Sequence, residues 1–143
     1  MIDHLANATT TVAADADRVW AAMTEPSLVE GWMLGARVES EWHVGSRITW
    51  SGVYEGRQFE DHGTILAVAP ASLLRFTHFS PLSGRQDIPE NYHTVTWTLE
   101  PDGDGTLVRL TQDNNETEDA AAHSSTNWQS MLDELRKVAE AAG

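Results

Sequence analysis

The first quarter of the chain begins with a strand-like segment and continues with a helical pattern of hydrophobic positions. Residues 9–13 predict a short first strand. Asp15 has the residue type of a helix N-cap, and the apolar spacing after it predicts a helix through Met23. Pro26 suits a first helical position and Gly31 a helix end, which predicts a second helix. We therefore expect two short helices directly after the first strand.

Through the middle of the chain, apolar and polar residues alternate with a period of two, which is typical of half-buried antiparallel strands. Glycine and proline clusters separate these segments, and Gly63 is expected to bend the longest one. The segment 81–90 is rich in proline, glycine and serine and predicts an exposed loop. The strands predicted here cover residues 36–42, 46–54, 57–68, 73–80 and 93–100, and a further strand containing 108–112 follows a hairpin turn at 101–105.

In the last quarter the period changes from two to 3.6, which indicates one long amphipathic helix ending near Ala141. Asn115 with Glu118 resembles a capping box at its start. Its apolar stripe contains Ala121, Ser125, Trp128, Leu132, Leu135 and Ala139. This helix is the only predicted element large enough to cover the apolar face of the sheet. We find no repeat or linker and predict one α+β domain over residues 1–143, with about six to seven antiparallel strands.

Composition narrows the classes of function. The chain has 143 residues, no cysteine and a net charge of −13, and Lys137 is its only lysine. We therefore expect no nucleic-acid partner and no binding to an anionic membrane, because both depend on basic residues. Without cysteine there is neither a disulfide framework nor a thiolate metal site. The first residues have neither the basic nor the apolar stretch of a signal peptide, so we expect a cytoplasmic, acidic protein.

Several motifs resemble a known superfamily. The motif Val19-Trp20-Ala21-Ala22-Met23-Thr24-Glu25-Pro26, followed by Gly31-Trp32, is similar to the "VW-x-A-L/M-T-x-P … W" opening of START-like (SRPBCC) proteins. Within that superfamily it resembles the branch named after activators of the heat-shock protein 90 ATPase. Further matches are the glycine-kinked strand Gly63-Thr64-Ile65-Leu66 through Pro70, the strand Leu74-Arg75-Phe76, and the closing helix Trp128-Gln129-Ser130-Met131-Leu132-Asp133-Glu134-Leu135. The match covers nearly the whole chain in order.

The resemblance implies a helix-grip fold, in which a curved antiparallel sheet wraps around the long C-terminal helix. It also implies an internal cavity that in relatives holds hydrophobic or amphipathic molecules. Those relatives include lipid carriers, plant hormone receptors, aromatic polyketide cyclases and chaperone activators. The fold alone does not fix the function, so the side chains of the cavity must do so.

The expected ligand site is aromatic, because six rings lie on predicted inward faces. We expect the ligand to contact Trp32, Trp50, Phe59, Phe76, Trp97 and Trp128, together with Leu132 on the helix stripe and the two histidines His62 and His78. Ligand pockets combine such an apolar lining with a few polar groups. In the competing interpretation, the same rings fill the interior as an ordinary core.

Three histidines lie in strands whose alternate residues point inward: His62, His78 and His93. His78 shares the face of Phe76 and is the first candidate for a pocket acid or base, with His62 as the second. A metal held by Asp61, His62 and His78 is the weaker alternative, since the chain has no thiolate and no HExxH pair. We expect no metal and no cofactor, and we expect Glu55, Glu60 and Asp61 to form a solvated edge.

Three functions remain open at this level. The first is binding of a hydrophobic, aromatic or lipid-like small molecule, without catalysis. The second is a cyclase or hydrolase acting on a polyketide-like substrate with a pocket histidine. The third is an interaction module that stimulates a chaperone ATPase, which the branch name alone suggests. The oligomeric state is left open, with a homodimer among the options.

Overall fold

The computed structural model describes residues 4–33 and 35–141, so the first residues, on which the signal-peptide expectation rests, lie outside the description. The chain forms one seven-stranded antiparallel sheet with a long C-terminal helix and two short helices after the first strand, which confirms the predicted α+β helix-grip class. The elements are β1 (His4–Val12), α1 (Ala16–Thr24), α2 (Pro26–Val29), β2 (Arg37–Ser40), β3 (Arg47–Tyr54), β4 (Arg57–Ala69), β5 (Leu73–His78), β6 (His93–Asp102), β7 (Gly105–Asn115) and α3 (Glu118–Ala141). Short 3₁₀ segments at Pro81–Ser83 and Pro89–Asn91 lie within the predicted loop.

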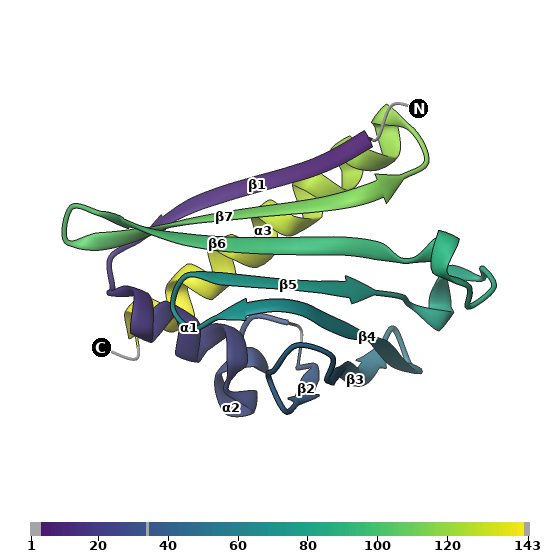
Figure 1. Ribbon diagram of the computed structural model, residues 1–143, viewed down its shortest axis with the longest axis horizontal. Helices are drawn as coiled ribbons and strands as arrows, with labels where there is room; N and C mark the ends of the chain where they lie inside the picture. The colour runs from purple at the N-terminus through teal and green to yellow at the C-terminus, as the bar shows by residue number, and fades with distance from the viewer. Residues whose placement is uncertain (1–3, 34, 142–143) are drawn as a thin grey trace.

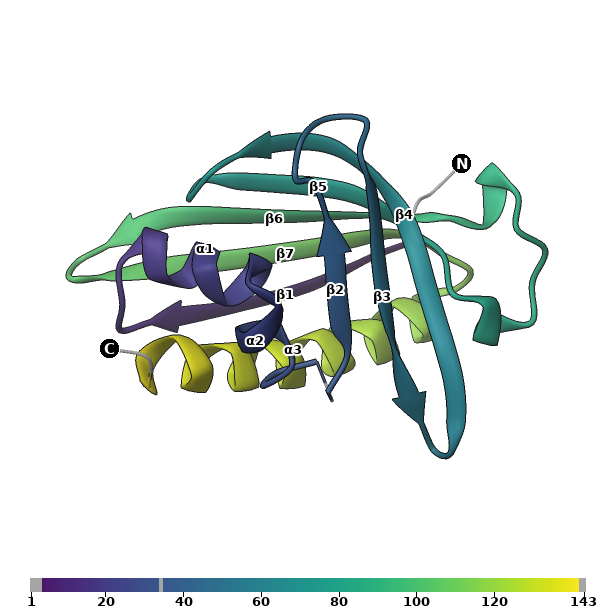
Figure 2. The ribbon, with the colours of Figure 1, turned by 90° about the horizontal axis from the view of Figure 1, so that it is seen from below.

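The strands follow the order β1-β7-β6-β5-β4-β3-β2, so the first strand joins the sheet beside the last one (Figure 1). The sheet curves strongly: β2, β3 and β4 run steeply across the direction of β5, β6 and β7 (Figure 2). Helix α3 lies along the concave side and α1 packs near its C-terminal end (Figure 2). The space between α3 and the curved sheet is therefore where an internal site can form.

The predicted stripe of α3 faces this space. Leu132 and Leu135 are fully buried, and Trp128 is half-buried at the edge of the core. The predicted capping box at Asn115 is wrong, because Thr117 caps the helix by accepting a hydrogen bond from the Ala120 amide at 3.0 Å. The Asn115 side chain instead donates to the carbonyl of His4 at 2.8 Å, and so ties β7 to β1.

Both short helices begin as predicted. The Asp15 carboxylate accepts a hydrogen bond from the Arg18 amide at 2.9 Å, and Pro26 occupies the first turn of α2. The indole of Trp32 donates to the Ala22 carbonyl at 2.7 Å, which fixes the segment after α2 against α1. Every helix of the described residues is too short or too polar to span a bilayer.

Gly63 allows β4 and β5 to approach closely at the bend. A Cβ atom at this position would lie 1.6 Å from the Thr77 carbonyl oxygen, which no side chain can tolerate. The ladder between β4 and β5 also shifts register between Ile65 and Ala67. The glycine thus permits the curvature that separates the two halves of the sheet.

Several strand boundaries differ from the prediction, including those of β1 and β2. β1 begins at His4 instead of residue 9, because its pairing with β7 extends to Asn115. β2 ends at Ser40 instead of residue 42, because the next residues leave the sheet in a loop that side chains stabilise. Neither difference could be detected from alternation alone, since both depend on the partner that a segment meets.

Candidate functional site: an aromatic interior with two clefts

A narrow cavity of about 40 Å³ lies between the sheet and α3, and we call it the enclosed cavity because side chains surround most of it. Its size corresponds to little more than one water molecule. Aromatic and thioether side chains dominate its wall. The lining residues are Met23, Trp32, Met33, Trp42, Ile48, Trp50, Leu74, Phe76, His78, Trp97 and Trp128.

The rings themselves occupy most of this interior. Trp97 makes edge contacts with Trp32 and Trp128, at centroid distances of 5.7 and 6.0 Å. The ring centroids of Trp50 and Phe76 are 5.0 Å apart. Such pairs stabilise one another beyond their buried area. The cavity expected from the sequence is therefore small in this structure. Packed aromatic rings occupy most of the interior, as the core interpretation of the tryptophans expects.

A second space, which we call the mouth cleft, opens beside this cavity and measures about 240 Å³. It lies between β3, β4, the segment after β5 and the side chain of Met131 on α3. Its lining residues are Met33, Ala36, Trp50, Val53, Phe59, Asp61, Ser80, Leu82 and Met131. Met33 and Trp50 also line the enclosed cavity, so these two side chains separate the cleft from the interior.

Asp61 and His78 form a pair at the inner wall of these spaces. The Nε2 atom of His78 lies 3.0 Å from Oδ2 of Asp61, and the side chains are 28% and 18% exposed. The imidazole contacts the Trp50 indole edge-on, with 5.2 Å between the ring centroids. A carboxylate that accepts from one ring nitrogen fixes the tautomer and leaves the other nitrogen able to exchange a proton. The other carboxylate oxygen, Oδ1 of Asp61, is buried and has no hydrogen-bond partner.

A polar pocket of about 230 Å³ lies on the other side of His78. It is formed by the end of β5, the loop after it and the start of α3. The imidazole of His93 also lines it, and its Nδ1 atom donates to the Asp113 carbonyl at 2.8 Å. Arg85 of the loop forms an ion pair with Glu116 across the pocket wall. His78 is thus shared by an aromatic cavity and a polar pocket.

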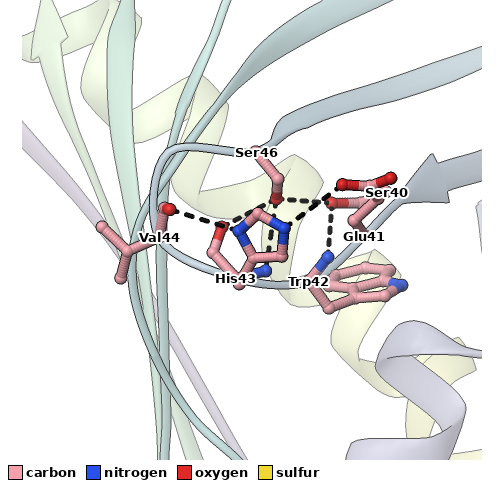
Figure 3. A network of polar contacts seen from close by, with 6 residues as sticks. All are labelled: Ser40, Glu41, Trp42, His43, Val44 and Ser46. Carbon is pink, nitrogen blue, oxygen red and sulfur yellow. Dashed lines mark hydrogen bonds and ion pairs between the residues drawn. The ribbon is translucent and has the colours of Figure 1, made fainter.

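Trp42 lies on the loop between β2 and β3 (Figure 3) and lines the enclosed cavity. Its φ of 60° is rare for a residue with a large side chain. Ser40 accepts a hydrogen bond from the Trp42 amide at 3.0 Å, and Ser46 accepts one from the His43 amide at 3.2 Å (Figure 3). These serine hydroxyls stabilise the strained backbone and so hold the indole over the cavity.

His62 lies on the opposite face of the sheet from the aromatic interior. Its Nε2 atom is 3.1 Å from Asp87, and its ring contacts Phe79 and Tyr92. Burial, a hydrogen bond to Asp87 and the charge of Asp87 raise the pKa of Tyr92 to about 12. This cluster holds the loop after β5 against the sheet and does not reach the interior.

The structure brings most of the predicted residues together. Trp32, Trp50, Phe76, His78, Trp97 and Trp128 line the enclosed cavity, and Phe59 lines the mouth cleft. Leu132 is buried in the core. Neither Leu132 nor His62 lines the enclosed cavity or the mouth cleft. Within the part of the chain that is described, no three His, Asp or Glu side chains are grouped as metal ligands.

The sequence did not identify Trp42 as a lining residue of the enclosed cavity. It also predicted Asp61 on a solvated edge, whereas Asp61 lines the mouth cleft. A signal for Asp61 was present, because it has the same parity as Phe59 on β4 and so points to the same face. The position of Trp42 follows from a loop conformation that alternation does not encode. No sequence pattern indicated that methionines such as Met33 and Met131 would line these spaces.

The family model for "Activator of Hsp90 ATPase homolog 1-like protein" matches residues 13–140. The chain belongs to this family. A protein from Cytophaga hutchinsonii of known solution structure is 45% identical to it, with a TM-score of 0.83 over 96% of this chain and 94% of that one. No curated protein matches the chain significantly.

More distant structures share the fold. The Aha1 dimer from Colwellia psychrerythraea is 22% identical, with a TM-score of 0.73, over 98% of this chain and 97% of that one. DynU16, a protein in the dynemicin biosynthetic locus, is 20% identical with a TM-score of 0.77. The aligned region covers 95% of this chain but only 47% of DynU16. At these identities the likeness shows the fold alone.

Proposed function

We propose that this protein binds a small hydrophobic or aromatic molecule between the curved sheet and α3. The observation that carries the proposal is the mouth cleft of about 240 Å³, which shares Met33 and Trp50 with the enclosed aromatic cavity. Apolar walls with a few convergent polar groups are the usual form of a ligand site. The molecule would enter at the cleft and contact the aromatic interior at its inner end.

The sizes of the spaces limit the ligand. A cleft of about 240 Å³ is below the range of roughly 300–1,000 Å³ that drug-sized ligands occupy, so we expect a molecule of one or two rings. A larger ligand requires Met33 to move, which a methionine does at low cost because its side chain is unbranched and flexible. Movement of Met33 would join the cleft to the cavity.

Calorimetric titration with apolar aromatic probes tests this proposal. We expect saturable binding to the wild type and at least about tenfold weaker binding to Leu82→Trp, which fills the cleft. Leu66→Trp is the matched control: it is 43% exposed on β4 outside the cleft, and this variant should bind as the wild type does. Absence of saturable binding to the wild type, or equal loss in both variants, would contradict the proposal.

The Asp61–His78 pair favours an enzyme as the second candidate. Its 3.0 Å contact orients an imidazole beside both the aromatic cavity and the polar pocket, as a general base requires. A polyketide-like substrate would place an aromatic body in the interior and a reacting carbonyl near His78. The titrations separate the two candidates: a bound probe recovered unchanged supports binding, whereas a probe consumed by the wild type and spared by His78→Ala supports catalysis.

Two partner proposals come from the relatives. The dimer of the Colwellia protein supports a homodimer for this chain, which light scattering on the purified protein measures directly. The family description is the one observation that suggests a chaperone partner. A cytoplasmic location likewise stays a prediction.

A further inference from the structure

We propose that the molecule bound in the mouth cleft is a protonated amine on an apolar body, whose ammonium group donates to Oδ1 of Asp61. This inference rests on the proposed ligand function and adds the chemical class of the ligand. It also gives Asp61 a role in selecting that ligand.

The first observation is the hydrogen-bond state of Asp61. Its Oδ2 atom is 3.0 Å from His78, whereas Oδ1 is buried and has no partner among the described residues. A buried carboxylate oxygen that lacks a donor is costly, because it has lost water without gaining a replacement. Asp61 lines the mouth cleft. Because Oδ1 is buried, a donor on a bound ligand would reach it through a turn of the carboxylate toward the cleft, and would then supply the missing hydrogen bond.

The second observation is the charge of the cleft. Among the described residues that line it, Asp61 is the one ionisable side chain, Ser80 is the one hydroxyl and the others are apolar. A neutral donor would satisfy Oδ1, but a cation also compensates the carboxylate charge and forms a stronger, charge-assisted hydrogen bond. A carboxylate ligand would meet a like charge and is disfavoured. The net charge of −13 adds a long-range attraction for cations.

The third observation is the position of two aromatic rings. Trp50 and Phe59 both line the cleft with Asp61, on the neighbouring strands β3 and β4. An ammonium group near Asp61 would lie beside these two aromatic side chains, and the face of an aromatic ring attracts a cation. The apolar part of the ligand would then contact Met33, Leu82 and Met131. The unpaired oxygen of Asp61, the negative charge of the cleft and its aromatic and apolar lining therefore all favour an amine on an apolar body.

The test compares three probes with one apolar body: phenylbutylamine, phenylbutanol and phenylbutanoate. Binding is measured by calorimetry at neutral pH and physiological ionic strength. We expect the amine to bind the wild type at least about tenfold more tightly than the alcohol, and the carboxylate to bind most weakly. This comparison uses the unmodified protein, so it does not depend on how any variant folds.

Two variants that remove the same charge locate the effect. Asp61→Asn should abolish the preference for the amine, so that the amine and the alcohol bind this variant with affinities that agree within about twofold. Glu60→Gln is the matched control, because Glu60 is the exposed neighbour on β4 and lies outside the lining of the cleft. This variant should keep the preference, apart from a small general loss.

The outcomes distinguish the inference from the function on which it rests. If the alcohol binds as tightly as the amine, if the carboxylate binds most tightly, or if both variants lose the preference equally, the amine proposal is overturned while ligand binding stands. If none of the three probes binds, both proposals are overturned together. An amine preference that disappears only in Asp61→Asn supports the inference.

Discussion

The Asp61–His78 hydrogen bond lies where the mouth cleft, the enclosed cavity and the polar pocket meet. Asp61 lines the cleft, and His78 lines the other two spaces. A change at either side chain therefore reaches all three. This pair, more than any single tryptophan, gives the interior a chemistry beyond hydrophobic contact.

Tyr92 provides a prediction at the residue scale. Burial, its hydrogen bond to Asp87 and the Asp87 charge raise its pKa from 10.0 to about 12, so the folded state favours the protonated phenol. That contribution to the free energy of unfolding is complete below about pH 10 and is lost as the pH rises from 10 toward 12. Urea unfolding at about pH 9 and about pH 11.5 should therefore show a steeper fall for the wild type than for Tyr92→Phe. Equal slopes for the two proteins would show that Asp87 and burial do not act on this phenol.

At the scale of elements, α3 and the curved sheet depend on each other. The helix buries Leu132 and Leu135 completely against the sheet. Its side chains also bond to β1: Ser125 accepts from the Asn7 amide at 2.9 Å, and Gln129 donates to the Thr9 carbonyl at 2.8 Å. These contacts hold the edge strand and fix the distance between helix and sheet.

Leu132→Ala should destabilise the protein by about 2–5 kcal/mol, because it removes a fully buried side chain and leaves a cavity. The free energy of unfolding from urea titrations measures the effect. Ser130→Ala is the control, since Ser130 is exposed on the same helix and its replacement should change stability by no more than about 0.5 kcal/mol. A loss below about 1 kcal/mol in Leu132→Ala would mean that helix and sheet are held mainly by other contacts.

The loop that carries Trp42 is the second element with a defined role. Its backbone strain is balanced by the hydroxyls of Ser40 and Ser46, which bond to the loop at both ends (Figure 3). Such strain is common where a side chain must be held in one place. The loop thus completes the wall of the enclosed cavity from outside the sheet.

For the whole molecule, the dominant property is its charge. A net charge of −13 on 143 residues destabilises the compact state through self-repulsion, which salt screens. We expect the Tm to rise by roughly 2–5 °C between about 0.02 and about 0.3 M NaCl. Differential scanning calorimetry measures this, with KCl as the control for an effect of the particular cation. A Tm that stays constant or falls would show that favourable ion pairs outweigh the repulsion.

The sequence by itself determined the fold class and the aromatic character of the interior. Strand alternation placed Trp50, Phe76 and Trp97 on one face, and the helical period placed Trp128 and Leu132 opposite them. These assignments depend only on the periods of strand and helix, which are local. The family resemblance rested on the same local motifs.

The tertiary structure alone decided how much of that interior is open and which polar groups face it. The size of the cavity depends on how the five indoles of its lining pack with their neighbours, which no local pattern encodes. His62 and Asp61 are neighbours in sequence, yet the pleat sends one to each face of the sheet. Beside Gly63, His62 pairs with Phe79, and this tertiary pairing of β4 with the end of β5 places Asp61 within 3.0 Å of His78.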